Sequence, residues 1–252
     1  MFYICIPAFN EAPTIGVLLW RIRKTLEDFP REYELLVYDD GSTDETAEVL
    51  ASYMTVLPLT VLGGKEHVGY AKAVEALLRA AAQRTRYARR DAIILLQGDF
   101  TDSPEHIPEL VRRFEGGADI VTTSRAANGS TPTPERRLRR VAPWLLRPFV
   151  SLEGVKDPFS AYRLYRVAVV RDAIKTAGTQ ALASAERWAA NVDFLLTLMP
   201  HARRVESVEL APRYDIRPRE SRIRPLADAV ALYKFGRGAR GRRATVVSTP
   251  PA

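Results

Sequence analysis

Short apolar runs alternate along the chain with longer segments in which apolar residues recur at helical spacing. The runs are rich in β-branched and aromatic residues, as expected for covered strands, and they lie at 2–6, 35–38, 56–62, 91–96, 118–123 and 203–210. The periodic segments predict helices that begin near positions 14, 43, 71, 104, 166, 183 and 225. This alternation of strand and helix predicts an α/β fold with a largely parallel central sheet flanked by helices.

The composition is that of one globular domain. A chain of 252 residues with 46% hydrophobic content can bury one sizeable core, which we expect over residues 1–235. Residues 236–252 contain little apolar surface, so we expect a basic, disordered tail. The single cysteine, Cys5, lies in an apolar run and favours a buried thiol in a reducing compartment.

The apolar runs are far shorter than the ~20 residues that span a bilayer, and Met1 leads straight into a strand-like run rather than a signal peptide. We therefore expect a cytoplasmic protein, with peripheral contact at the inner face of a membrane as a further possibility. The segment 135–150 interleaves arginines with Trp144, Leu145 and Phe149. It fits either an anionic membrane surface or an ordinary solvated helix face.

A formal net charge of +7 suggests an anionic partner: a nucleotide, a lipid phosphate, a membrane surface or a nucleic acid. Acidic side chains follow two of the predicted strands, with Asp39 and Asp40 after the second and Asp99 and Asp102 after the fourth. Ligands of open α/β sheets gather beyond the carboxyl ends of the strands, so we expect a binding site there. The glycine-rich segment 63–71 could bring Lys65 or His67 to a phosphate, although such residues are often only polar surface.

Seven segments, taken together and in order, resemble the motifs of one family. The first, Pro7 to Glu11, resembles P-x-Y-N-E; the others are 39–44 (D-D-G-S-x-D), 68–71, 97–105 in the place of D-x-D, 124–125, 157–163 (D-P-x-S-G-F-R) and 220–222. The chain is thereby similar to family 2 glycosyltransferases of the Rossmann-like GT-A fold, and within them to the dolichyl or polyprenyl phosphate mannose synthase branch.

The resemblance implies roles for individual residues. Asp99 would bind the divalent cation, Mg²⁺ or Mn²⁺, that bridges the two phosphates of a sugar nucleotide, with Gln97 and Thr101 as further ligands. Arg125, Arg219 and Arg222 would face the diphosphate or an acceptor phosphate. The remaining substrate-binding positions that the motifs imply are Pro7, Ala8, Asn10, Glu11, Asp39, Asp40, Gly98, Arg163 and Ser221, and the glycine-rich segment adds Lys65.

Two positions depart from the family pattern. Gln97 replaces the first Asp of D-x-D, and an amide oxygen without formal charge should hold a hard cation less tightly, although Asp102 could compensate. Arg222 stands for the Lys of the late loop, which keeps the charge but changes the donor geometry.

The implied reaction is an inverting sugar transfer, with mannose from GDP-mannose favoured as donor and a polyprenyl phosphate as acceptor. A phosphate acceptor is already ionised and needs no strong base, whereas a hydroxyl acceptor requires one. Glu186, Asp157 and Asp193 are the candidate bases, and Glu186 is the first to test; Asp157 could instead cap a turn and Asp193 could lie on a solvated helix face.

Other functions are kept as alternatives. A UDP-sugar donor with a small soluble hydroxyl acceptor is a close variant, and Gln97 leaves room for a nucleotide-sugar binding protein without catalysis. Nucleic-acid binding is disfavoured because the arginines of the tail lack interleaved aromatic residues. A dinucleotide-dependent dehydrogenase is disfavoured because the first loop lacks the glycine fingerprint.

Overall fold

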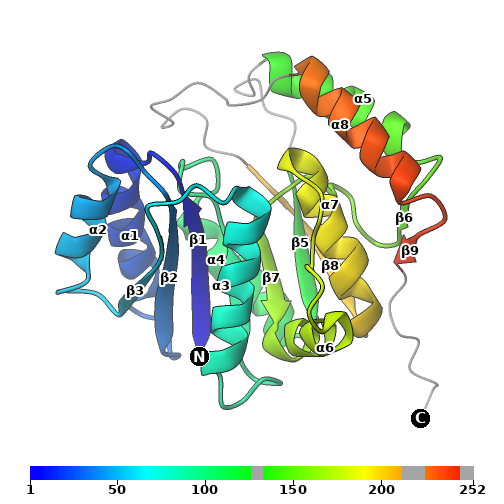
Figure 1. The fold of residues 1–252 in the computed structure, drawn as a ribbon. Coiled ribbons are helices and arrows are strands. Elements are labelled where there is room, and N and C mark those ends of the chain that lie inside the picture. The colour runs from blue at the N-terminus through cyan, green and yellow to red at the C-terminus, as the bar shows by residue number, and fades with distance from the viewer. Residues whose placement is uncertain (126–132, 212–224, 245–252) are drawn as a thin grey trace, which may run out of the picture.

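The computed structural model describes residues 1–125, 133–211 and 225–244, and it contains a seven-stranded sheet between two layers of helices (Figure 1). The strand order is β3-β2-β1-β4-β7-β5-β8, and the α/β fold expected from the sequence is confirmed. The sheet strands are β1 (Phe2–Ala8), β2 (Tyr33–Asp40), β3 (Leu59–Gly64), β4 (Ala92–Leu95), β5 (Ile120–Arg125), β7 (Arg163–Arg166) and β8 (Val205–Leu210).

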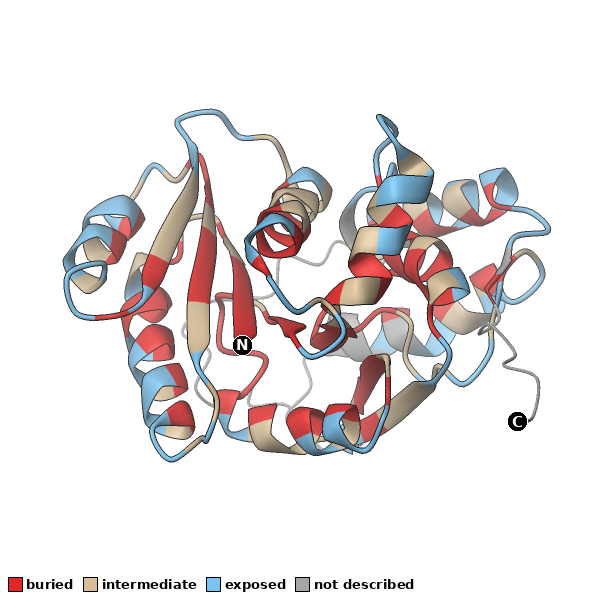
Figure 2. Ribbon diagram, turned by 90° about the horizontal axis from the view of Figure 1, so that it is seen from below, coloured by how far each residue is buried: buried red, intermediate tan, exposed pale blue. Residues whose placement is uncertain are grey.

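Two apolar clusters, one on each face of the sheet, form the core. On one face α1, α2 and α4 contribute the residues packed against Phe2, Ile4 and Ile6. On the other, α3, α6 and α7 pack against Tyr3 and Cys5. The helices turn their buried sides to the sheet and their exposed sides outward (Figure 2). Their bounds are α1 (Ala12–Leu26), α2 (Thr46–Tyr53), α3 (Tyr70–Arg84), α4 (Ile107–Glu115), α6 (Val167–Ala177) and α7 (Arg187–Leu198).

One strand runs against the others. β7 pairs antiparallel with both β4 and β5, whereas the other neighbouring strands in this sheet pair in parallel. Because β7 separates β4 from β5 and opposes both, β4 and β5 run in the same direction. The carboxyl ends of β1, β2, β4 and β5 therefore meet at one edge of the sheet, where the sequence placed its candidate residues.

The helices α5 (Thr133–Leu146) and α8 (Pro225–Gly238) lie side by side and stand apart from the sheet (Figure 1). Leu138, Ala142 and Leu146 of α5 are buried, as is Leu232 of α8. A side chain at Gly236 would clash with Phe149, since its Cβ would lie 2.8 Å from Phe149 Cδ2. The absence of a side chain at Gly236 thus permits this close approach. We call α5 and α8 together the α5–α8 pair.

The start of the predicted tail is ordered, which corrects the expectation of disorder for residues 236–244. Helix α8 continues to Gly238, and β9 (Arg243–Ala244) pairs with β6 (Ser151–Leu152). Gly241 also donates its N–H to the carbonyl of Phe149 at 3.1 Å, and Ala244 is fully buried. These long-range contacts compensate for the low apolar content of the segment. Residues 245–252 lie outside the described part of the chain.

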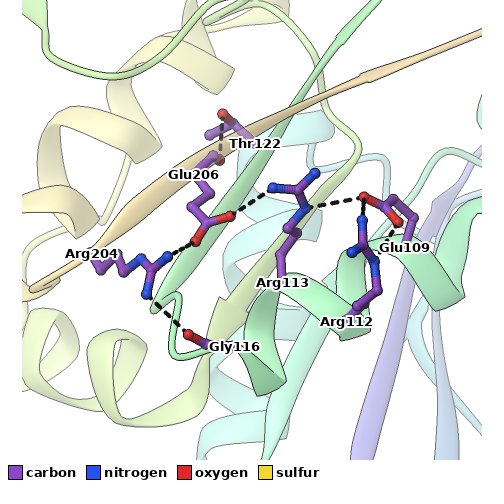
Figure 3. Close-up of polar contacts among 7 residues, drawn as sticks. All are labelled: Glu109, Arg112, Arg113, Gly116, Thr122, Arg204 and Glu206. Atoms are coloured by element: carbon purple, nitrogen blue, oxygen red, sulfur yellow. Dashed lines mark hydrogen bonds and ion pairs between the residues drawn. The ribbon is translucent and has the colours of Figure 1, made fainter.

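The edge strand β8 is tied to α4 by a network of charges (Figure 3). Arg113 contacts Glu109 at 3.1 Å and Glu206 of β8 at 3.2 Å, and Arg204 contacts Glu206 at 2.6 Å. Charged side chains on an edge strand also oppose pairing with another chain. These arginines are therefore accounted for by the fold and do not need an external anion.

Among the described residues, no helix combines the length and the apolar character that crossing a bilayer requires.

Candidate active site

The loops after β1 and β2 are joined to each other. Asn10, with φ of 53°, donates its backbone N–H to Ser42 Oγ at 3.0 Å and accepts the N–H of Thr43 on its side-chain oxygen at 2.7 Å. Glu11 donates its backbone N–H to Thr46 Oγ1 at 2.9 Å. Asn10, expected to bind substrate, thus holds two loops of the site together.

Asp40 fixes the loop between β3 and α3. Its buried carboxylate accepts the backbone N–H groups of Val68 at 2.6 Å and Gly69 at 3.1 Å, and His67 Nδ1 lies 3.1 Å from the same carboxylate. Asp39 accepts the N–H of Ser42 at 3.0 Å. Both carboxylates therefore shape the loops of this edge. Their predicted contact with a base or ribose stays a prediction.

Asp99 lies in a tight turn just beyond β4. One of its oxygens accepts the N–H of Thr101 at 3.0 Å, and Phe100 between them has φ of 63°, the left-handed conformation that few non-glycine residues adopt. Asp102 closes the turn by accepting the N–H of Gln97 at 3.2 Å. Asp99 and Asp102 are both buried. Asp102 thus braces the turn that carries Asp99.

The motifs after β1 and β4 meet in space. A Cβ built on Gly98 would lie 3.4 Å from Glu11 Cγ and 3.5 Å from the carbonyl oxygen of Pro7. The structure thereby brings together Pro7, Glu11 and Gly98, which are distant in the sequence. Ala8 is buried beside them in β1, while Lys65 is exposed just beyond β3 and Arg125 is partly buried at the end of β5.

The turn after β4 offers oxygen donors suited to a hard cation. Thr101 Oγ1 is buried and has no hydrogen-bond partner among the described residues, and it follows the Asp99 carboxylate by two positions. Within the described ranges no group of three His, Cys, Asp or Glu could hold a metal ion. A carboxylate and a hydroxyl oxygen suit a hard cation such as Mg²⁺ or Mn²⁺, and Mg²⁺ is commonly held by one or two carboxylates together with substrate phosphates and water.

Arg163 does not face the site, which corrects its assignment as a substrate-binding residue. It is 1% exposed, and its guanidinium donates to the carbonyls of Pro158 and Asn191, both at 2.7 Å. A fully buried guanidinium needs such acceptors because an unpaired buried charge is costly. Arg163 therefore holds the loop after Asp157 against α7.

The candidate bases lie near the start of α7. Asp157 accepts the N–H of Phe159 at 3.0 Å, the turn-capping contact weighed from the sequence, while Glu186 is exposed at the first position before α7. Phe159 stacks on Trp188 of α7 with ring centres 5.6 Å apart, which joins the two segments. Arg219, Ser221 and Arg222 lie outside the described residues.

Sequence reasoning missed the role of Asn191 as a polar anchor on α7. Asn191 accepts a hydrogen bond from Tyr70 at 2.8 Å and donates to the carbonyl of Phe159 at 3.1 Å. Burial raises the pKa of Tyr70 well above its ordinary value, so this hydroxyl stays a donor. Asp193, one of the candidate bases, is 2% exposed, so the alternative that it lies on a solvated helix face is wrong. The sequence does contain a signal for these contacts: polar residues among the apolar ones of a buried helix are expected to form hydrogen bonds within the protein.

Comparisons with solved structures agree with this architecture. Glucosyl-3-phosphoglycerate synthase from Mycobacterium tuberculosis, solved with Mn²⁺, UDP-glucose and glycerol 3-phosphate, matches with a TM-score of 0.59 and 19% identity over 93% of this chain and 76% of that one. S. aureus TarS with UDP-GlcNAc matches with a TM-score of 0.55 and 20% identity, over 84% of this chain and 57% of that one. At such identities the likeness concerns the fold, which confirms the expected GT-A architecture.

Curated relatives match part of the chain. The undecaprenyl-phosphate 4-deoxy-4-formamido-L-arabinose transferase of Photorhabdus laumondii is 33% identical over 125 residues, or 49% of this chain and 36% of that protein. The bactoprenol glucosyl transferase of Shigella phage SfV is 29% identical over 172 residues, or 67% of this chain and 53% of that protein. The chain spans about half the length of these relatives or less.

The family model for glycosyl transferase family 2 matches residues 3–174, which include the joined loops after β1 and β2 and the braced turn after β4. Because this match covers well over half of the chain, the protein belongs to glycosyl transferase family 2.

Proposed function

We propose that this protein transfers a sugar from a nucleotide-diphosphate sugar to a polyprenyl phosphate, with inversion at the anomeric carbon. The observation that carries the proposal is the meeting of Pro7, Glu11 and Gly98 beside the braced turn of Asp99, at the edge where ligands of open sheets bind. The names of the two curated relatives, which contain undecaprenyl phosphate and bactoprenol, support the choice of acceptor.

The donor would lie over the loops after β1 and β2. Asp39 and Asp40 would contact its base or ribose, with Pro7 and Ala8 beside them. Asp99, Gln97 and Thr101 would hold Mg²⁺ or Mn²⁺, which supplies neutralisation of the diphosphate charge. The buried unpaired hydroxyl of Thr101 and the Mn²⁺ of the solved neighbour support this assignment.

In the reaction, an acceptor oxygen forms a bond to the anomeric carbon while the bond to the diphosphate breaks, and the nucleoside diphosphate leaves with the electron pair. Arg125 would stabilise the charge that develops on the leaving group. A lipid phosphate acceptor is ionised already and needs no base, and Glu186 and Asp157 would then accept hydrogen bonds from hydroxyls of the sugar as it is transferred. With a hydroxyl acceptor, Glu186 would remove the proton.

Two donor classes compete for the site. The resemblance to mannose synthases favours GDP-mannose, whereas the solved neighbours carry UDP-glucose and UDP-GlcNAc. Titration of the protein with GDP-mannose and UDP-glucose, each with and without Mn²⁺, distinguishes them. We expect one donor to bind at least about tenfold more tightly than the other, since a site that hydrogen-bonds one base leaves polar groups unpaired with another.

The α5–α8 pair would rest on an anionic membrane surface, consistent with a peripheral protein at the inner face. Trp144 is 74% exposed, and Val141, Val230 and Tyr233 are also largely exposed on the two helices. Arg140 and Arg147 are exposed on and just after α5. Exposed aromatic and aliphatic side chains beside arginines are typical of interfacial helices.

The decisive experiment measures sugar transfer to undecaprenyl phosphate in phosphatidylglycerol vesicles with each donor and Mn²⁺. We expect a lipid-linked sugar and free nucleoside diphosphate in equal amounts, and little product with Asp99→Asn. Donor binding without any product would instead favour the nucleotide-sugar binding protein suggested by Gln97. Product with a soluble hydroxyl acceptor but none with the lipid would favour the other variant.

A further inference from the structure

Asp193 is a buried carboxylate that organises the segment leading into α7. One of its oxygens accepts the N–H groups of Ser184 at 2.8 Å and Ala185 at 3.2 Å, and also contacts Ser184 Oγ at 3.3 Å. The next residue is Glu186, which directly precedes the helix. Asp193 thus fixes the backbone of the segment 184–186 from inside α7. We call residues 184–186 the Glu186 segment.

The second oxygen of Asp193 is held by the C-terminal end of the described chain. Arg242 donates to it at 2.8 Å, across 49 positions of sequence, and the Arg242 side chain is 44% exposed. The adjacent strand β9 pairs with β6, and Gly241 donates to the carbonyl of Phe149. These backbone contacts therefore place Arg242 next to Asp193.

These contacts form a continuous path from the α5–α8 pair to the Glu186 segment. The path leads from α8 through Gly241 and Arg242 to Asp193, and from Asp193 to the backbone of Ser184 and Ala185. An ionised carboxylate with one oxygen on two N–H groups and the other on a guanidinium has one preferred orientation. Without the guanidinium, the second oxygen of this buried carboxylate has lost its cationic partner. An unpaired buried charge is costly, which favours rotation of the Asp193 side chain toward water.

We propose that Arg242 is a positioning residue, which acts through Asp193 to hold the Glu186 segment in its active geometry. This inference rests on the proposed function for its catalytic consequence only. It assigns the segment after α8 a part in the acceptor side of the active site.

The structural part of the test is hydrogen exchange of the Ser184 and Ala185 amides in the full chain. In Arg242→Ala we expect exchange to accelerate about tenfold at these amides, with the amides of β1 and β4 unchanged. Arg242→Lys should restore part of the protection, because it keeps the charge but not the geometry. The matched control is Arg240→Ala, which removes an exposed arginine from the same segment.

The catalytic part uses undecaprenyl phosphate vesicles and whichever of UDP-glucose and GDP-mannose the wild type turns over. We expect Arg242→Ala to lower kcat roughly tenfold with the KM for the donor nearly unchanged, and the double variant Arg242→Ala, Glu186→Ala to be no slower than Glu186→Ala alone. If the losses of kcat in Arg242→Ala and Glu186→Ala were fully additive in the double variant, the positioning role would be overturned, because Arg242 would then not act through the Glu186 segment.

Unchanged exchange at Ser184 and Ala185 in Arg242→Ala, or equal acceleration in Arg240→Ala, would overturn the proposal outright. A wild type that turns over neither donor would contradict the proposed function but not the structural part of this inference, because the exchange measurement needs no substrate and tests that part by itself.

Discussion

The loops around Asp99 and the α5–α8 pair differ in how their side chains interact with their surroundings. In the first region, carboxylates at the strand ends accept the chain's own N–H groups: Asp40 holds Val68 and Gly69, and Asp102 holds Gln97. In the α5–α8 pair, Trp144 and Val230 expose apolar surface to solvent. The first region resembles a preorganised site for a small charged ligand, and the second a docking surface.

This difference suggests that the two regions would bind different partners, a diphosphate in the first and a membrane surface in the second. A diphosphate is small and strongly charged, so its site gains from groups that are held in place before it arrives. A membrane surface is large and fluid, so exposed apolar and cationic side chains can bind it without exact placement. Substitutions in the two regions should therefore affect different measurements.

The largest effect is expected from Asp99→Asn. Removing the charge that would hold the cation should lower kcat by about 100-fold or more, measured as nucleoside diphosphate release. Vesicle binding should be unchanged. Asp172→Asn, at an exposed position on α6, is the control. Full activity of Asp99→Asn would remove the central residue from the proposed site.

A large loss of stability is expected from Gly63→Ala. Gly63 has φ of 95°, and a Cβ there would lie 2.1 Å from the carbonyl oxygen of Asp39. The substitution should lower the free energy of unfolding in urea by at least about 2 kcal/mol. Gly64→Ala, with open space at the Cβ position, should change it by less than about 0.5 kcal/mol. Equal effects of the two would contradict the rigidity ascribed to this region.

A smaller and different effect is expected from Trp144→Ala. Affinity for phosphatidylglycerol vesicles, measured by sedimentation, should fall roughly tenfold because a large apolar side chain no longer enters the interface. The free energy of unfolding and the Kd for the donor should stay the same. Tyr87→Ala removes another exposed aromatic residue and serves as the control. Weaker donor binding in Trp144→Ala would break the comparison between the two regions.

The smallest effect concerns pH. Burial raises the pKa of Asp44, but hydrogen bonds from Thr46 and from the backbone of Ala12 and Thr46 outweigh it, so the pKa lies below the ordinary 3.8. The folded pKa is lower than the unfolded one, so Asp44 contributes stability above pH 3.8 that is lost as the pH falls through the folded value. Asp44→Asn should flatten the pH dependence of the free energy of unfolding below about pH 5. An unchanged slope would contradict this role.

Much of the fold was predictable because it depends on local patterns. The apolar run of β1 and the helical spacing of Ile15, Leu18 and Ile22 in α1 place both elements. The antiparallel direction of β7 was not predictable, since four residues carry no signal of direction. The start of α2 at Thr46 was also missed, because the Asp44 side chain binds the N–H of Thr46 and delays the helix.

The candidate site also has features that the sequence predicted and features that it did not. The spacing of Asp99, Asp102 and the glycine between Gln97 and Asp99 indicated a turn at a strand end, and the structure contains one. Arg163 looked equally polar in the sequence, yet its guanidinium is buried on carbonyls of the chain. A sequence shows that an arginine is charged, but only the packing shows whether its partner is a ligand or the protein itself.

The order of residues by itself determined the alternation of strand and helix, the sheet edge at which Asp40 and Asp99 lie, and the membership of glycosyl transferase family 2. Those features follow from periodicity, turn chemistry and motifs of a few residues, all of which are local. Tertiary structure alone decided that the segment after α8 is ordered and that Arg242 reaches Asp193. That contact joins positions 49 apart, and its stability depends on burial that no local pattern encodes.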